Sequence, residues 1–477
     1  MSTYKPALVA LILTVSLAGT LFAVQPPDRS PQVIVRAGAS DMAAIAEQYG
    51  VTILAESGRN GHKALVAGPA TMTAEQLRDL MTGDPRIESL DLAMIASLPT
   101  DGGVTIAAEE AAPNTLKVGD FTTPCLGQGF GELLWSGYAD QEMMAQVHLH
   151  EAQAASRNCG DVVVAVLDTG VDPQHPLLEG ALLPGYDLVY GAAGKASEWT
   201  ELQGSVTGII EGSVTGIIEG SVTGIIEQEN IAVLEGRGDV EVVNAGGGPI
   251  LASTTIEDLL GLELPPSFGH GTMVAALVRL AAPNAKILPI RIFDGAGNAH
   301  VYDVVEAIYY AVDSGADVIN MSFSLHEGSK ELRRAIEYAA ENGVVTVAAA
   351  GNQGQRTRIF PAALNDTIGV ASVTDADVLS EFSNFGDALV DVAAPGHGVV
   401  SAYPGGLYAA GWGTSFSTPV VAGTVALMVK NYPGQRDVQM VRELTRDLRE
   451  GAERLSGQNE IGAGRLNALA AVNASAN

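Results

Sequence analysis

The chain has 477 residues, a length that suggests two to four folding units rather than one small core. Its formal net charge is -29, with 55 acidic side chains against 26 basic ones. This negative field repels phosphate backbones, so nucleic acid is excluded as a favoured partner. An acidic balance fits either an ordinary solvated surface or adaptation to salt, and it names no function by itself.

The N-terminal segment is apolar. Lys5 precedes the uncharged run Ala7 to Val24, which has the length of a secretory signal core or of a membrane span. Residues 1–24 are therefore expected to be a signal peptide that is removed, or else a retained N-terminal anchor. Both alternatives predict export, and the membrane is a partner only if the segment is retained.

The chain has two cysteines, Cys125 and Cys159. An exported protein meets an oxidising compartment, so these two residues are candidates for one disulfide. Two unpaired buried thiols are the alternative, because the sequence does not give the Cα separation that a bridge requires.

Residues 32–97 alternate between short strands and helices. This βαββαβ order predicts a small α+β, ferredoxin-like unit. Residues 98–129, rich in Gly, Ala, Thr and Glu, are expected to form a linker. The expected strands are Gln32–Ala37, Val51–Ser57, Lys63–Ala67 and Ile87–Ile95, and the expected helices are Asp41–Tyr49 and Thr73–Met81.

Residues 130–477 are expected to form the main domain, since apolar strands alternate there with helical patterns. Near-continuous Val, Ile and Ala runs between helices favour a parallel sheet with helices on both faces. The predicted fold class is α/β. The expected strands are Val162–Leu167, Ile287–Ile292, Val318–Met321, Val344–Ala349 and Ile368–Val373.

One segment breaks this alternation. Residues 204–227 are three identical copies of GSVTGIIE, in which Gly punctuates β-branched residues. Three short copies are too few for a self-supporting solenoid, so residues 192–264 are interpreted as a surface insertion. The tripeptide Arg237-Gly238-Asp239 resembles an adhesion motif, but three residues occur often by chance.

Three motifs carry candidate chemistry. Asp168-Thr169-Gly170 follows a strand, where open α/β folds place their sites, although a buried Asp there could simply accept backbone N–H groups. Gly269-His270-Gly271-Thr272 opens a helical run, Met273 to Ala282. His397 also lies between two glycines, but a strand-like run follows it. Ser415 is expected just before the helical run Val420–Val429, which has Pro419 in its first turn. At that position the N–H groups of the helix end face a negative charge that develops during the reaction.

The order Asp, His, Ser and the surrounding blocks resemble the subtilisin family. The blocks are VAVLDTGVD, GHGTMVAALV, APNAKILPIRIFD, ADVINMSFS, VVTVAAAGNQG and GTSFSTPVVAG, and they span residues 164–423. This resemblance implies that Ser415 is the nucleophile, His270 the general base and Asp168 the residue that orients the histidine. It also implies that the Asn352 side chain and the Ser415 N–H donate to the oxyanion.

The same resemblance implies that an extended peptide lies against residues 322–325 and 349–351. The candidate substrate-binding residues are Ser322, Phe323, Ser324, Ala349, Ala350 and Gly351. Ser324 stands where glycine is common in the family, so a changed S1 preference is expected. His175-Pro176-Leu177 lacks the Asp that often ligates calcium there, so no metal is predicted at that position, and no cofactor is predicted.

The resulting expectation is an exported serine endopeptidase that hydrolyses peptide or protein substrates. Residues 32–97 resemble the inhibitor-like propeptides of the family, so a self-processed precursor is expected, with the propeptide as its inhibitor. The first rival is an aspartic protease using Asp168 and Asp313, but Asp313 follows the helical run Val304–Val312, whereas aspartic proteases are built of strands. The second rival is a catalytically silent subtilisin-like protein that binds peptides or adheres to surfaces.

Overall fold

The structure is a computed structural model, and it describes residues 30–98, 115–117, 125–126, 130, 133–159, 161–194, 196–200, 240–243, 265, 267–457 and 460–476. The expected leader at residues 1–24, the repeats at residues 204–227 and the tripeptide at residues 237–239 lie outside these ranges.

The N-terminal unit has the predicted βαββαβ order and forms a four-stranded antiparallel sheet, β2-β3-β1-β4. Alternate residues of β1, such as Val33 and Val35, point into a small core with Leu77 of α2. A capping box between Thr73 and Gln76 begins α2. Its elements are β1 (Gln32–Ala37), α1 (Ala39–Tyr49), β2 (Thr52–Ser57), β3 (Lys63–Ala67), α2 (Ala74–Met81) and β4 (Ile87–Leu92).

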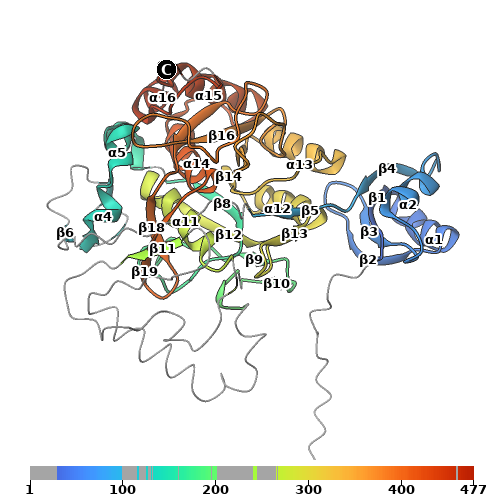
Figure 1. The fold of residues 1–477 in the computed structure, drawn as a ribbon. Helices are drawn as coiled ribbons and strands as arrows, with labels where there is room; N and C mark the ends of the chain where they lie inside the picture. Colours follow the sequence, from blue (N-terminus) through green and yellow to red (C-terminus); the bar gives the residue numbers. More distant parts are fainter. Residues whose placement is uncertain are drawn as a thin grey trace, which may run out of the picture.

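The expected closing strand at Ile87–Ile95 is wrong at its end. Strand β4 stops at Leu92, and the chain then forms β5 (Ile95–Ser97), which pairs with β13 (Asn298–His300) of the C-terminal part of the chain. Residues 92–96 are a continuous apolar run without a Gly or Pro, so the sequence could not reveal that the strand changes partners. Figure 1 shows the blue N-terminal unit joined through β5 to the region of β13 and α12.

The C-terminal part of the chain is built on an eight-stranded sheet in the order β10-β9-β12-β8-β14-β15-β16-β17. Every neighbouring pair except β9 and β10 is parallel, which confirms the predicted α/β class. The strands are β8 (Val163–Asp168), β9 (Tyr186–Asp187), β10 (Ala192–Ala193), β12 (Lys286–Arg291), β14 (Val318–Met321), β15 (Val345–Ala349), β16 (Thr367–Val373) and β17 (Val392–Pro395). The predicted strands agree within one residue at each end.

Helices cover both faces of this sheet (Figure 1). Val164 and Val166 of β8 pack with α11 (His270–Ala281) and α14 (Thr414–Asn431) on one face. Ala165 and Leu167 pack with α12 (Val301–Asp313) and α13 (Lys330–Glu341) on the other. The near-continuous apolar run in β8 is thus explained, because a buried strand needs apolar side chains on both faces.

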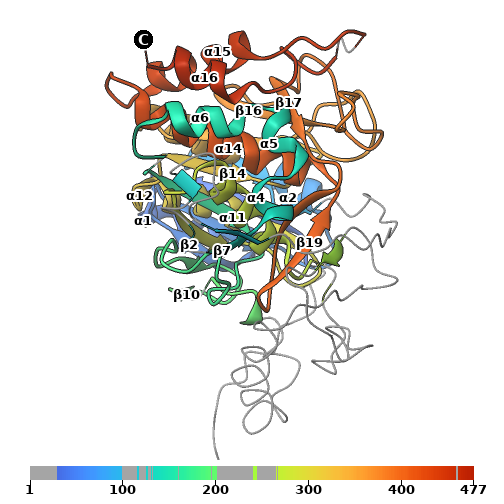
Figure 2. The ribbon, with the colours of Figure 1, turned by 90° about the vertical axis from the view of Figure 1, so that its left-hand side faces the viewer.

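A further layer of helices lies over α14 (Figure 2). It includes α6 (Leu149–Ala155), α15 (Val438–Gly451) and α16 (Ala468–Ala474), with the short α4 (Ser136–Ala139) and α5 (Glu142–Gln146) nearby. The N–H of Ala468 donates to the carbonyl of Val147, which ties the C-terminal helix to the α5–α6 connection. Within the described ranges, no helix combines the length and apolarity needed to cross a bilayer.

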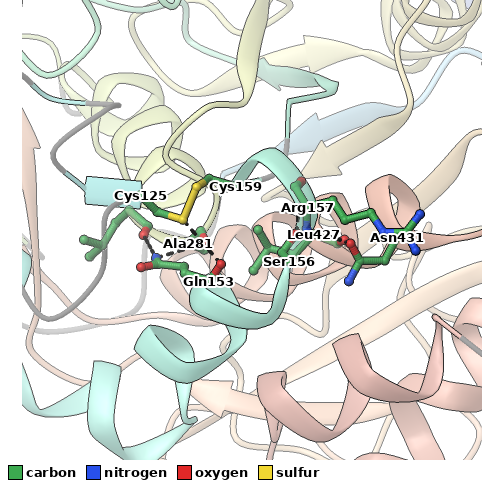
Figure 3. Close-up of a disulfide and its surroundings, with 9 residues drawn as sticks. Cys125, Gln153, Ser156, Arg157, Cys159, Ala281, Leu427 and Asn431 are labelled. Carbon is green, nitrogen blue, oxygen red and sulfur yellow. Dashed lines mark hydrogen bonds between the residues drawn. A yellow bond between two sulfur atoms is a disulfide. The ribbon is translucent and has the colours of Figure 1, made fainter.

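Cys125 and Cys159 form a disulfide, with their Cα atoms 5.5 Å apart (Figure 3). Cys159 ends the short 3-10 helix η1 (Arg157–Cys159) that follows α6. Nearby, Gln153 Nε2 donates to the carbonyls of Leu280 (2.7 Å) and Ala281 (3.2 Å) at the end of α11. The bridge therefore ties Cys125 to the end of the segment that precedes the main sheet, and the Gln153 hydrogen bonds hold this segment against α11.

Two expected irregular regions contain paired strands. Within the expected linker, β6 (Thr115–Lys117) pairs with β7 (Leu133–Trp135). Within the expected surface insertion, β11 (Val240–Val243) pairs with β19 (Leu407–Gly411), which pairs in turn with β18 (Val399–Tyr403). Strand β19 leads directly to α14, so this part of the insertion lies beside the segment that carries Ser415 (Figure 2 labels β19).

Candidate active site

Asp168 and His270 meet at the carboxyl edge of the central sheet. Asp168 is the last residue of β8 and is fully buried, and its Oδ1 lies 2.8 Å from His270 Nδ1. The Thr169 N–H also donates to Asp168 Oδ1 at 2.8 Å. Helix α11 begins at His270, and a side chain at Gly271 would collide with the carbonyl oxygen of Gly170. The glycine therefore lets the start of this helix approach the aspartate loop closely enough for the pair to form.

The rival histidine and the rival aspartate lie elsewhere. His397 stacks on Phe382, with ring centroids 6.1 Å apart, and the predicted strand follows it as β18. Asp313 ends α12, and its carboxylate is 47% exposed, 3.8 Å from Arg59. Because Asp168 is fully buried and Asp313 lies at an exposed helix end, the two do not form a carboxylate dyad.

Ser415 lies in the first turn of α14, which corrects its expected place before the helix. The helix starts at Thr414, so Pro419 lies beyond the first turn. Proline has no N–H, so Pro419 cannot donate the helical hydrogen bond to the carbonyl of Ser415, four residues earlier in the chain. Ser322 Oγ donates to that carbonyl instead, at 2.9 Å. The predicted substrate residue Ser322 thus supports the backbone at Ser415.

The Ser415 side chain faces the same region. Its Oγ donates to the Ser322 carbonyl at 3.0 Å, and Ser415 is only 2% exposed. The His270 ring lies 5.7 Å from the ring of Phe416, the next residue along α14. The start of α14 and the start of α11 therefore come together at the sheet edge where β8 ends.

The orientation of the Asn352 side chain is set by Thr414. Asn352 Oδ1 accepts from the Thr414 N–H at 2.9 Å and from Thr414 Oγ1 at 2.7 Å. Because both Thr414 groups donate, the amide atom that they contact must be the oxygen, and the Asn352 Nδ2 donor therefore faces away from Thr414. A Cβ on Gly413 would come within 3.0 Å of Nδ2. Gly413 therefore keeps space beside this donor, and Thr414 is a site residue that the sequence analysis missed.

The two candidate substrate stretches differ in what they can offer. After β14, residues 322–324 leave the sheet; Phe323 is buried against Phe293, with ring centroids 5.3 Å apart, so its side chain serves the core. Ala349 and Ala350 are also fully buried, and the Ala350 N–H donates to Val370 in the neighbouring β16. A substrate peptide therefore cannot bind the Ala350 N–H, because that N–H is already used in the hydrogen bond to β16.

A further strand edge was missed in the sequence analysis. Strand β13 pairs with β5, and the Leu98 N–H donates to the Gly297 carbonyl at 3.0 Å. A Cβ on Gly297 would lie 3.5 Å from the Cβ atoms of both Leu98 and Ser267. Ser267 is three residues before His270, so the end of the N-terminal unit runs along β13 toward the histidine. Asn298–His300 carries no side-chain motif, which explains why its role as an edge was not visible.

The described residues contain no group of three or more His, Cys, Asp or Glu side chains placed to hold a metal ion. Leu177 is buried in the core, and the adjacent His175 Nδ1 accepts from the Leu177 N–H at 3.2 Å. This turn is held together by its own backbone and core contacts.

Comparison with known proteins places these features in a family. Residues 160–464 match the model of the subtilase family, peptidase S8. The "Thermophilic serine proteinase" of Bacillus sp. (strain AK1) is 32% identical over 313 residues, which are 65% of this chain and 61% of that protein. Thermitase of Thermoactinomyces vulgaris is 38% identical over 215 residues, which are 43% of this chain and 75% of thermitase. The chain thus spans less than two thirds of the length of the Bacillus protein.

A solved structure is similar across almost the whole chain. Fervidolysin from Fervidobacterium pennivorans, described as a keratinolytic enzyme related to subtilisin, aligns with a TM-score of 0.60 and 22% identity. The alignment covers 93% of this chain and 61% of fervidolysin, and at this identity the likeness concerns the fold alone. The expected subtilisin-like α/β fold is confirmed. The matched family model and the identity to thermitase together show that the chain belongs to the subtilase family.

Proposed function

We propose that the protein is an exported serine endopeptidase whose catalytic triad is Asp168, His270 and Ser415. The observation that carries this proposal is the 2.8 Å contact between Asp168 Oδ1 and His270 Nδ1 at the sheet edge where α14 presents Ser415. Several relatives of the chain are named as serine proteinases or subtilisins. Fluorophosphonate labelling of Ser415 is the experiment that tests it.

The mechanism follows from these positions. With its Nδ1 proton held by Asp168, His270 presents Nε2 as a base that takes the proton of Ser415 Oγ. Oγ then forms a bond to the peptide carbonyl carbon, and the carbonyl oxygen becomes an oxyanion. His270 returns the proton to the leaving amine as the C–N bond breaks, which leaves an acyl-enzyme. Water, deprotonated by His270, attacks this ester, and the Ser415 oxygen regains its proton as the acid is released.

The oxyanion is stabilised by two donors in this arrangement. Asn352 Nδ2 is directed by the contacts of its Oδ1 with Thr414. The Ser415 N–H lies in the first turn of α14, where N–H groups have no carbonyl partner within the helix. Both donors are fixed before the reaction begins, so little reorganisation is needed as charge develops.

Asn352→Ala is expected to lower kcat ~10²–10³-fold with little change in KM, because the donor acts only on the charged transition state. Steady-state kinetics on a tetrapeptide p-nitroanilide measures both constants. Asn365→Ala, in a loop between β15 and β16, is the matched control and should behave as wild type. A rise in KM at constant kcat would assign Asn352 to ground-state binding instead.

We propose further that residues 32–97 are a propeptide that inhibits the enzyme. The N-terminal unit packs on α12 and α13 through charged side chains. The guanidinium of Arg36 in β1 forms a buried ion pair with Glu331, with Nε 2.9 Å from Oε2. Asp91 Oδ2 accepts from Ser329 Oγ at 2.8 Å and from the Glu331 N–H at 2.7 Å, so it caps the start of α13.

A second contact lies on α12. Lys63 Nζ is 2.6 Å from Glu306 Oε1 and 4.5 Å from the centroid of the Tyr309 ring. Lys63 is fully buried, and this burial lowers the pKa of its ammonium group. Together with the pairing of β5 with β13, these contacts support an inhibitory role for residues 32–97.

Arg36→Met is expected to weaken binding of the cleaved propeptide ~10²–10³-fold, because it leaves the Glu331 carboxylate buried without its main partner. The dissociation constant of the cleaved complex, read from peptidase activity on dilution, measures this effect. Glu47→Gln is the control: Glu47 is an exposed residue of α1 and should leave binding unchanged. Equal affinity of Arg36→Met and wild type would contradict the proposed inhibitory interface.

Export is supported by the apolar segment at residues 7–24 and by the disulfide between Cys125 and Cys159. Peptide or protein substrates and the propeptide are the proposed partners. Mass spectrometry of the protein in the culture medium and in the membrane fraction tests release against retention of the N-terminal segment.

A further inference from the structure

One buried acid at the candidate active site has no role in the mechanism above. Glu198 lies at the start of the insertion and is only 2% exposed. Its Oε1 accepts from Thr169 Oγ1 at 2.5 Å and from the Gly271 N–H at 3.0 Å. Its Oε2 accepts from Thr272 Oγ1 at 2.5 Å. Glu198 therefore joins the residue that follows Asp168 to the two residues that follow His270.

The backbone around Glu198 is fixed in place. The Val171 N–H donates to the Ala196 carbonyl at 2.9 Å, and the Glu198 N–H donates back to Val171 at 3.2 Å. The next residue, Trp199, packs edge-on against Phe268, with ring centroids 5.3 Å apart. Residues 196–199, at the start of the expected surface insertion, are thus packed against the candidate site.

Each of the two hydroxyl groups around Glu198 accepts a backbone N–H and has its shortest acceptor contact, 2.5 Å, with Glu198. Thr169 Oγ1 accepts from the Gly271 N–H at 3.0 Å, and Thr272 Oγ1 accepts from the Asp172 N–H at 2.8 Å. Each hydroxyl proton is therefore turned toward Glu198, and the pocket offers three donors to one carboxyl group. An ionised carboxylate, which only accepts, satisfies all three.

Thr169 has a second possible acceptor, the catalytic aspartate. Its Oγ1 lies 3.3 Å from Asp168 Oδ1, the oxygen that His270 Nδ1 contacts at 2.8 Å. As long as Glu198 accepts from Thr169, that hydroxyl does not compete with His270 for Asp168 Oδ1.

We infer that Glu198 is a positioning residue of the catalytic centre, whose ionised carboxylate holds the Thr169 hydroxyl away from Asp168 and so keeps Asp168 Oδ1 for His270. This inference rests on the proposed triad and extends it. The insertion then contributes to catalysis through Glu198, which lies 29 positions after Thr169, the residue whose hydroxyl it holds.

Glu198 is a buried carboxyl group with a raised pKa. Burial raises the pKa of Glu198 to about 7, and the neighbouring Asp168 adds to this effect. Arg291 and Asp294 face it across a space of about 10 Å³, and His270 lies against Asp168, at 2.8 Å from its Oδ1. The Arg291 charge is paired with Asp187 at 3.2 Å, so it does not neutralise Glu198. Protonated Glu198 gives up one acceptor site, and the Thr169 hydroxyl then turns to Asp168.

The wild-type enzyme should therefore need two deprotonated groups, Glu198 and His270. A plot of log kcat/KM against pH is expected to fall with a slope approaching two on its acid side, since this ratio reports ionisations of the free enzyme. Glu198→Gln should reduce the slope to one, shift the acid side to lower pH and lower kcat about tenfold with KM within about twofold. A merely structural role would scale activity equally at every pH.

Two further variants complete the experiment. Thr169→Val removes the competing hydroxyl and should also give an acid-side slope of one. If Glu198→Gln does not fold, the comparison of the Thr169→Val slope with the wild-type slope tests the inference instead. Glu179→Gln removes an exposed charge nearby and should keep the wild-type profile. A wild-type slope of one, or a Glu198→Gln profile parallel to wild type, overturns the inference. If Ser415 is not labelled by a fluorophosphonate, the proposed triad fails instead.

Discussion

Ser415→Ala is expected to abolish peptide hydrolysis, with a loss in kcat on the order of 10⁶-fold, as for removal of the nucleophile in subtilisin. The reason is chemical, because in the proposed triad Ser415, at the start of α14, supplies the attacking hydroxyl and the histidine paired with Asp168 takes its proton. Without it no acyl-enzyme can form, although the oxyanion donors and the binding groups remain. Initial rates on a tetrapeptide p-nitroanilide, compared at equal concentrations of folded protein, measure the loss.

Ser417→Ala is the matched control for this loss. Ser417 is fully buried in the same helix, and its hydroxyl has no hydrogen-bond partner among the residues that the structure describes. Removing it should leave kcat close to wild type. Full activity of Ser415→Ala, or an equal loss in both variants, would contradict the assignment of Ser415 as nucleophile.

Self-processing is the prediction with the second largest effect. Wild type purified from a host without extracellular proteases should begin after the boundary at residues 96–103, whereas Ser415→Ala should keep residues 32–97. The described end of this segment supports the expectation, since Ala96 and Leu98 are buried along β13 and lead toward the residues before His270. Cleavage there requires the segment and the nucleophile in one molecule.

N-terminal sequencing and intact mass of both proteins read the result directly. Cleavage of both chains at one position would show that another protease makes the cut. If wild type and Ser415→Ala both remain uncleaved, the propeptide interpretation is wrong. The triad would then still be tested by the hydrolysis of short peptides. A second wild-type fragment that co-purifies with the enzyme is expected, because the N-terminal unit keeps its contacts with α12 and α13 after the cut.

Local patterns predicted much of this molecule. Continuous apolar runs identified the parallel strands because each buried strand has core on both faces, as β8 shows. Glycines beside His270 marked a close approach of two backbones, which the structure displays between Gly271 and Gly170. These features depend on residues that are neighbours in sequence, so a single sequence contains them.

Contacts between distant segments were not predictable in the same way. The start of α14 was misplaced because Pro419 was expected in the first turn, whereas a hydrogen bond from Ser322 compensates for the proline further along the helix. Thr414 orients Asn352 across 62 positions, and Glu198 reaches Thr169 and Thr272 from an insertion with no recognisable motif. Such roles depend on the fold and leave no local pattern.

The central claim is that Ser415 is an activated nucleophile, and covalent labelling tests it most directly. Wild type is treated with a fluorophosphonate, digested and analysed by mass spectrometry, beside Ser415→Ala and Ser417→Ala. We expect one adduct, on Ser415, in wild type and Ser417→Ala, and none in Ser415→Ala. An adduct on another residue, or equal labelling of Ser415→Ala, would contradict it.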